Sequence, residues 1–405
     1  MTDRVARILN FRTGELKLAV LAALFYFTVL CGYFFLRPVR EAMGVSRGMA
    51  DLRWLFVATS VVSLIIVLMF GGVVSRLDRR KIIPIGYLFV IVCLLVFAGL
   101  LIVDGATGGG LVGTEAETTT SRVVGYTYYV WLSVISLFVN SLFWAFMVDI
   151  FNVDQGKRMF AFIGIGGTLG ALVGGWTTKA VSRMTDSVYL PAGLMLTGAL
   201  FFGLAIVIML WLDRRAVQSD HSHLEASGVD ADGVATGPVP IGGKFWSGLV
   251  TVGRSPYLLG IAAYIVLMAV SNTLVYFSQA GVILANTDTF SQRVGSFALF
   301  DTLAQLATLL TQFFVTTRLI KRLGVGLTLM VMPLVTVLGF ATLAVWPVYG
   351  VMAIFAALHR ASRYAISRPA RETLFSVVPA DAKYKAKPLI DVFLYRGGDV
   401  AGVAL

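Results

Sequence analysis

The sequence contains few charged residues for its length. Asp, Glu, Lys and Arg make up 14% of 405 residues, whereas hydrophobic residues make up 58%. Ordinary globular domains carry roughly 25% charged and 45–50% apolar residues. A soluble domain cannot bury this much apolar surface, so a soluble enzyme, a secreted module and a disordered chain are excluded. The composition predicts an all-α polytopic membrane protein.

Cysteine and histidine are also scarce, with two and three residues. Cys31 and Cys93 lie in apolar runs, and His359 has no cysteine or carboxylate at ligand spacing. Neither a disulfide framework nor a metal site is therefore expected. A Walker-type Gly-x4-Gly-Lys-Ser/Thr sequence is absent from the chain, which argues against ATP-driven pumping. We expect a transporter rather than an enzyme, with no cofactor.

Acidic residues are outnumbered by basic residues, 22 against 33, which gives a net charge of +11. Most of the basic residues fall in alternate connections between the apolar runs when the N-terminus is placed in the cytoplasm. Because cationic inner loops explain the charge, no nucleic-acid partner is expected. We expect an integral protein of a bacterial inner (plasma) membrane with a cytoplasmic N-terminus.

Apolar runs of about 20 residues, long enough to cross a bilayer, recur along the whole chain. One run is too long for a single span, and Trp346-Pro347 divides it. The sequence therefore predicts ten complete spans and a truncated eleventh. The runs are 18–36, 54–75, 82–103, 123–148, 159–178, 187–212, 255–287, 294–317 and 323–358, followed by the segment that begins near Leu389.

A single long polar stretch interrupts the apolar runs at residues 213–256. Its first part, 213–243, has the composition of a disordered segment. Phe245, Trp246, Leu249 and Val250 favour an amphipathic helix at the membrane interface. We expect a 6+6 plan: an N-terminal six-helix bundle over 1–212, a cytoplasmic linker over 213–256, and an incomplete C-terminal bundle over 257–405.

The connection from Gly72 to Lys81 resembles the sequence that major facilitator transporters carry between spans two and three. In that superfamily an acid and several basic residues form a cytoplasmic clasp. Here Arg76 stands at the acid position and Asp78 at the second glycine, followed by Arg79 and Arg80. We interpret these four residues as a gating loop. A short inner loop is also basic by the positive-inside rule alone, so both interpretations stay open.

The fifth span contains glycines at four-residue spacing, Gly166, Gly170 and Gly174. A dinucleotide-binding loop is excluded, because that motif needs a preceding strand in a soluble unit. The spacing predicts a flat helix face for close helix packing. The segment also resembles the antiporter motif of major facilitator transporters, with Ala171 in place of the proline.

The tenth span carries charge, which inside a membrane is costly and by default functional. Arg360, Arg363, Tyr364, Ser367 and Arg371 recur at a spacing that places them on one face of an α-helix. Arginines on one face attract an anion, either acidic side chains or a bound phosphate. For Arg371 the alternative is that its side chain reaches the membrane interface.

Polar residues of other spans predict a water-filled cavity with cationic and hydrogen-bonding walls. Each of them can instead pair structurally, and Asp301 with an arginine of the tenth span is one such pair. The candidates for substrate binding are Asn140 and Trp144, Asn272, Tyr276 and Gln279, Asp301 and Gln305, and Asp391, Tyr395 and Arg396.

Several segments resemble the plastid and rickettsial nucleotide (ATP/ADP, NTP/NDP) exchange transporters: 33–41, 142–160, 163–167 and 371–399. The resemblance implies a major-facilitator-like fold and antiport of nucleotides or other phosphorylated anions. It places Arg40 and Arg371 where that family has basic substrate-binding residues, with Arg37 in the same segment as Arg40. Unlike those carriers, the run 255–287 has no charged residue between Pro256 and Thr287.

Our leading hypothesis is a secondary active transporter that exchanges nucleotides or related phosphorylated organic anions by alternating access. The alternative is a major facilitator transporter of another organic solute, proton-coupled through Asp301 or Asp391. A hypothesis of another class is a non-transporting membrane sensor or assembly component. The expected partners are the lipid bilayer and a small anionic substrate, and we expect a monomer.

Overall fold

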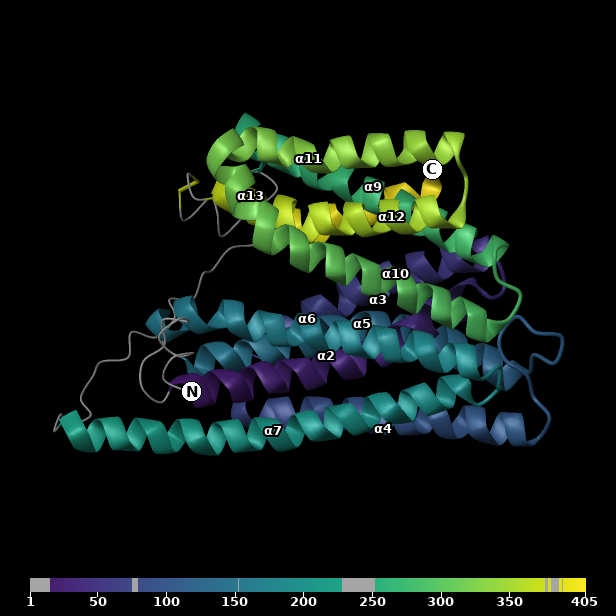
Figure 1. The fold of residues 1–405 in the computed structure, drawn as a ribbon, viewed down its shortest axis with the longest axis horizontal. Coiled ribbons are helices and arrows are strands. Elements are labelled where there is room, and N and C mark those ends of the chain that lie inside the picture. Colours follow the sequence, from purple (N-terminus) through teal and green to yellow (C-terminus); the bar gives the residue numbers. More distant parts are fainter. Residues whose placement is uncertain are drawn as a thin grey trace. The chain divides into compact units, whose positions relative to one another are not determined.

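The computed structural model describes residues 15–74, 79–151, 153–227, 252–375, 378–379, 386–387 and 389–405. Over these ranges the secondary structure is helical, without a strand and with one isolated β-bridge between Gly110 and Glu117 (Figure 1). Nine helices of the described chain are long and apolar enough to cross a membrane. The prediction of an all-α membrane protein is confirmed.

The chain divides into two compact units. Unit 1 contains residues 1–40 and 70–238. Within it, α4 and α7 lie side by side (Figure 1). Its helices are the larger part of α2 (Glu15–Val45), α4 (Arg79–Ala106), α5 (Thr119–Ile150), α6 (Val153–Met184) and α7 (Leu190–Ser227).

Unit 2 contains residues 41–69 and 239–405. In this unit α9 packs against α15, and α10 packs against α12. Residues 41–69 therefore group with the second unit rather than with the expected bundle over 1–212. Its elements are most of α3 (Met49–Val74), α9 (Pro256–Ala285), α10 (Phe290–Thr311), η1 (Gln312–Thr316), α11 (Thr317–Val345), α12 (Tyr349–Ala361), η2 (Ser362–Ser367), α13 (Arg368–Leu374), η4 (Leu389–Leu394) and α15 (Tyr395–Ala404).

The long apolar run 323–358 is divided where the sequence predicts. Helix α11 ends at Val345, with Trp346 as its C-cap, and α12 begins at Tyr349. A second break lies at the start of this run, at Gly324, which has φ 71° inside α11. Glycine adopts this left-handed conformation without a steric penalty, so the chain turns there and a new span begins.

The tenth span is continuous from Tyr349 to Leu374 but changes its winding in the middle, from α12 through the π-helix η2 to α13. Pro369 explains the change. Proline lacks an N–H group and its ring clashes with the carbonyl four residues earlier, which here belongs to Ala365. The wider π turn relieves this clash, and a π segment inside an α-helix is often found at a functional site.

Three of the prolines inside membrane-spanning helices share one feature. In each case a hydroxyl of a neighbouring element donates a hydrogen bond to the carbonyl oxygen four residues before the proline. Such carbonyls have lost their helical donor and must find another one inside a membrane. The three sets, as proline, carbonyl and hydroxyl donor, are Pro38 with Phe34 and Thr178 at 3.5 Å, Pro333 with Leu329 and Tyr264 at 3.2 Å, and Pro369 with Ala365 and Thr316 at 2.8 Å.

Helix α7 extends beyond the predicted end of its span and continues to Ser227. The prediction of disorder is therefore wrong for residues 213–227. That segment contains no glycine or proline, and the first glycine after it is Gly228, so nothing in the sequence stops the helix earlier. The amphipathic helix predicted around residues 245–250 lies outside the described residues.

Candidate functional site

Arg360 forms a buried ion pair. Its Nη1 atom lies 2.5 Å from Oδ1 of Asp301 on α10. The Asp301 side chain is 3% exposed and the Arg360 side chain 19% exposed, so the pair is largely removed from solvent. The carboxylate neutralises the charge of this arginine within the helix bundle, as the sequence allowed.

Arg363 is held by neutral groups. Its guanidinium donates through Nη1 to Oδ1 of Asn272 on α9, and through Nη2 to the hydroxyl of Tyr395 on α15. The same group lies over the ring of Tyr364, 5.0 Å from its centroid, and over the ring of Tyr395 at 5.5 Å. These contacts fix the orientation of the guanidinium without neutralising its charge.

Arg396 of α15 is the third arginine of the site. Its Nη1 atom lies 3.3 Å from Oδ2 of Asp399, whose Oδ1 accepts a bond from Thr273 of α9 at 3.4 Å. The close approach of α15 to α9 makes the contact between Thr273 and Asp399 possible. A Cβ on Gly398 or Gly402 would meet backbone oxygens of Val266 or Val270, at 2.8 and 3.1 Å. Sequence analysis missed this pair of glycines, although their four-residue spacing is the signal used for α6.

We call Arg360, Arg363, Arg396, Asp301 and Asp399 the arginine cluster. When both aspartates are ionised, the set contains three positive and two negative charges, which leaves one positive charge in excess. Two of the arginines have a carboxylate at hydrogen-bond or ion-pair distance, whereas the Arg363 guanidinium donates to an amide and a phenol. Asp399 interacts electrostatically with both Arg396 and Arg363, so these two arginines share one carboxylate.

Arg371 belongs to a different group at the far end of the tenth span. Its Nη2 atom lies 3.6 Å from Asp391 and 3.8 Å from Glu372, and Lys387 contacts Glu372 at 2.6 Å. Arg371, predicted on the same helix face as Arg360 and Arg363, thus has different partners from both. Tyr364, expected on the same face, lies beside Arg363 in the π turn of η2 and is 43% exposed.

The remaining predicted residues of unit 2 lie on α9 and α10. The Tyr276 hydroxyl donates to Oε2 of Glu41 at 2.6 Å, and its ring packs against Phe56. Gln279 is buried, and Gln305 is partly buried one turn after Asp301. Among the bonds described for these residues, none joins Tyr276, Gln279 or Gln305 to the arginine cluster.

In unit 1, Arg40 donates from Nη1 to the Ser133 hydroxyl of α5 at 3.0 Å and lies over the ring of Tyr129. Arg37 lies 6.0 Å from the centroid of the Phe34 ring. Both arginines therefore contact neighbouring side chains of unit 1. Partners such as Ser133 escape sequence analysis, because spacing along one helix does not say which helix lies opposite.

Asn140 and Trp144 lie one turn apart on α5. Tyr26 of α2 donates from its hydroxyl to Oδ1 of Asn140 at 2.8 Å. The Trp144 ring makes edge contacts with Tyr26, Phe143 and Phe160 at centroid distances of 5.3–5.5 Å. Asn140 and Trp144, the two predicted residues of this span, thus both contact Tyr26.

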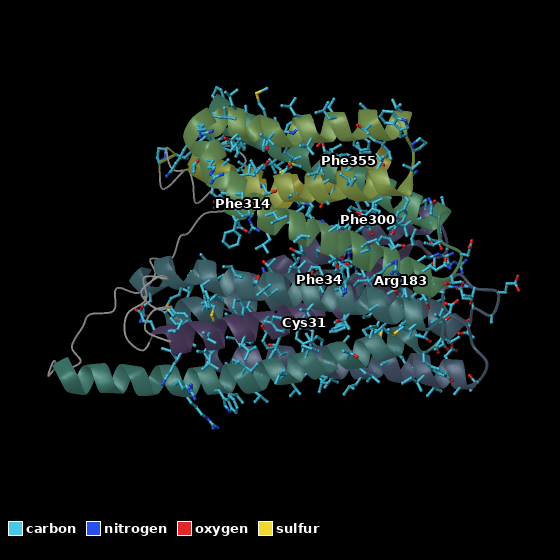
Figure 2. All side chains as sticks on the ribbon, in the orientation of Figure 1. Cys31, Phe34, Arg183, Phe300, Phe314 and Phe355 are labelled. Atoms are coloured by element: carbon cyan, nitrogen blue, oxygen red, sulfur yellow. The ribbon has the colours of Figure 1, made fainter. Side chains whose placement is uncertain are left out.

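The glycines of α6 lie over the backbone of α2. A Cβ on Gly166 or Gly170 would overlap the carbonyl oxygens of Ala23 or Phe27. A Cβ on Gly174 would lie 2.6 Å from the carbonyl oxygen of Cys31, which Figure 2 labels on α2. The two backbones are therefore closer than any side chain at these positions would allow.

Of the predicted gating loop, Arg76 and Asp78 lie outside the described residues. Arg79 and Arg80 are the first two residues of α4, and their side chains also lie outside the described part.

Known proteins are similar to this chain in sequence and in fold. A family model described as "TLC ATP/ADP transporter" matches residues 121–356, more than half of the chain. ADP,ATP carrier protein 1 of Chlamydia pneumoniae is 22% identical over 300 residues, which cover 67% of this chain and 57% of the carrier. The chloroplastic ADP,ATP carrier protein 2 of Arabidopsis thaliana is also 22% identical, over 67% of this chain and 46% of that protein. The chain spans about half the length of these relatives.

Solved transporter structures share the fold at low sequence identity. A point mutant of the nucleoside transporter NupG superposes with a TM-score of 0.62 at 11% identity, covering 95% of this chain and 90% of that chain. A bacterial homologue of the iron transporter ferroportin, in the inward-facing state, gives a TM-score of 0.59 at 13% identity, with coverages of 96% and 92%. The predicted major-facilitator-like fold is confirmed.

Proposed function

Since this chain belongs to the TLC ATP/ADP transporter family, we propose that it exchanges nucleotides or related phosphorylated anions across a bacterial inner membrane by alternating access. In this proposal it acts as a major-facilitator-type antiporter with a cytoplasmic N-terminus. Loaded forms of the protein alternate between the two sides, and an internal anion leaves for each external anion that enters.

The observation that carries the proposal is the excess positive charge of the arginine cluster. A buried group of charges with one cation in excess is unfavourable, so the site gains stability when an anion binds. Arg363 has five N–H donors, of which Asn272 and Tyr395 occupy two. The others can form a bidentate pair with a phosphate, the geometry that favours arginine over lysine.

Arg40 and Arg371 have supporting roles in this proposal, because the family resemblance places substrate contacts at both. Arg371 already lies between Asp391 and Glu372, so a substrate phosphate there competes with two carboxylates. Arg360 is neutralised by Asp301 and acts mainly in structure. Arg363 is therefore the residue whose loss we expect to affect anion binding most.

The test is counter-exchange by the purified protein in liposomes. Vesicles are loaded with ADP or left empty, and uptake of labelled ATP is followed. We expect uptake that depends on internal ADP and is abolished by Arg363→Ala. Arg363→Lys keeps the charge but not the bidentate geometry, so a partial defect is expected.

Arg183→Ala is the matched control, because Arg183 is an exposed arginine at the end of α6. It should leave exchange unchanged. Uptake into empty vesicles at the same rate would overturn exchange in favour of uniport or symport. Wild-type exchange by Arg363→Ala would remove the arginine cluster as the anion site.

A further inference from the structure

Helix α5 presents a line of polar and aromatic residues within unit 1. Ser133, Asn140 and Trp144 follow one another at intervals of seven and four residues, which places them on one helical face. Ser133 accepts a bond from Arg40, and Asn140 accepts one from Tyr26. One face of α5 thus contacts the Arg40 guanidinium at Ser133. Further along, the same face carries the Asn140 amide and the Trp144 ring.

The depth of Asn140 determines what it can face. It is exposed and lies ten residues before Ile150, the end of α5, which corresponds to about 15 Å at 1.5 Å per residue. Helix α5 has 32 residues and is about 48 Å long, so it extends beyond a hydrocarbon core about 30 Å thick. Asn140 lies eight residues inside the end of the apolar run 123–148 and therefore within that core. An exposed amide at this depth is unfavourable against lipid, so in a transporter it faces the aqueous path.

The hydrogen bond from Tyr26 fixes the orientation of the Asn140 amide. Because the carbonyl oxygen points to the Tyr26 hydroxyl, the planar amide turns its Nδ2 group, with two N–H donors, away from Tyr26. Tyr26 is in turn held by a stacked contact with Phe143, at a centroid distance of 4.1 Å. The Asn140 donors are therefore preorganised beside the half-buried ring of Trp144.

We propose that Asn140 and Trp144 form a nucleobase subsite on unit 1, with Tyr26 as the residue that positions Asn140. This proposal rests on the proposed function, since it assigns the base of the same phosphorylated substrate. Trp144 supplies an aromatic surface on which a base stacks, and the Asn140 amide bonds to acceptors on the edge of the base.

The chemistry of the subsite favours a base over a simple anion. Asn140, Trp144 and Tyr26 are uncharged, so they offer a phosphate group no ion pair. Arg40 contacts α5 at Ser133, seven residues or about 10 Å from Asn140 along the helix axis. A nucleotide is long enough to reach from Trp144 toward Arg40. Pyrophosphate, in contrast, has no ring that could stack on Trp144.

The experiment compares two probes, ATP and inorganic pyrophosphate, by equilibrium binding to the purified full chain. Trp144→Ala should weaken ATP binding about tenfold or more, as expected for the loss of one stacked base, and leave pyrophosphate binding unchanged. Asn140→Ala and Tyr26→Phe should weaken ATP binding less, again without an effect on pyrophosphate. Arg40→Ala, in the same unit as the subsite, should weaken the binding of both probes.

Trp144→Phe retains an aromatic surface and should recover most of the ATP affinity. Trp176→Ala removes an exposed tryptophan of α6 in the same unit and should change neither affinity. Asn140→Ala replaces an exposed residue and tests the subsite even if Trp144→Ala fails to fold.

Two results would overturn the proposal. If Trp144→Ala and Asn140→Ala leave ATP binding unchanged, or reduce ATP and pyrophosphate binding by the same factor, the subsite is wrong and the proposed function stands. If the wild-type protein binds neither probe, the proposed function itself fails, and the subsite with it.

Discussion

The two units accommodate polar groups inside the membrane in different ways. In unit 1, close packing comes from glycines of α6 on the backbone of α2, and Arg40 contacts a hydroxyl and an aromatic ring. In unit 2, arginines pair with aspartates, and the described helices change to π winding at η1, η2 and η4. Charge and irregular helix geometry thus occur together in unit 2.

This association has a geometric reason. A regular α-helix places residues i, i+3, i+4 and i+7 on one face, so Arg360 and Arg363 would lie close together, with Arg371 about 16 Å beyond Arg360 along the axis. Of the three, Arg363 lies within the π turn of η2, and Arg360 precedes it. Arg360 meets α10, Arg363 meets α9 and α15, and Arg371 meets Asp391. Three arginines of one span can therefore have three different roles.

The largest effect that tests this contrast is expected at the buried ion pair of unit 2. Asp301→Asn leaves Arg360 without its carboxylate, and breaking a buried pair in this way typically costs about 3–5 kcal/mol. A marked fall in the thermal unfolding temperature of the purified protein is expected. The double substitution of Asp301→Leu with Arg360→Met removes both charges and should recover most of the loss.

The control in unit 1 is Arg122→Ala. Arg122 contacts Glu117 at 2.6 Å, but its side chain is 47% exposed, and exposed pairs contribute about 0–1 kcal/mol. Equal losses for Asp301→Asn and Arg122→Ala would contradict the view that unit 2 depends on buried charge.

A smaller effect is expected from the glycine contact of unit 1. Gly170→Ala places a Cβ against the carbonyl of Phe27, and overpacking of this kind costs about 1–3 kcal/mol. Gly164→Ala on the same helix meets nothing within 4 Å and should be neutral or slightly stabilising, because alanine favours a helix more than glycine does. The unfolding temperature should therefore be lower for Gly170→Ala than for Gly164→Ala. Similar values would show that α2 and α6 are not in tight contact.

The spans were predictable from the sequence because each needs only a local run of apolar residues. The division at Trp346-Pro347 was predictable for the same local reason. The partners of Arg363 were not, since Asn272 and Tyr395 lie on helices far away along the chain. The change in winding at η2 depends on a clash between Pro369 and the Ala365 carbonyl, which the 3.6-residue pattern ignores. The grouping of residues 41–69 with unit 2 likewise depends on contacts such as Glu41 with Tyr276, which no spacing along one helix reveals.

The smallest expected effect concerns the carbonyls that prolines leave without a helical donor, because both units solve this problem with a threonine. Thr316→Val in unit 2 removes the 2.8 Å bond to Ala365, and the loss of one such bond costs about 0.5–1.5 kcal/mol. Thr178→Val in unit 1 should cost less, because its oxygen lies 3.5 Å from Phe34 and only 2.8 Å from the Gly174 carbonyl of its own helix.

Thr336→Val provides the reference for this series, since the Thr336 hydroxyl donates to Met332 in its own helix, at 2.8 Å. Unfolding temperatures should therefore fall most for Thr316→Val, less for Thr178→Val and least for Thr336→Val. The same loss in all three would mean that the carbonyl facing Pro369 finds another donor once the hydroxyl is removed. In that case the π turn alone would suffice to accommodate the proline, and the bond from Thr316 to the tenth span would add nothing to its stability.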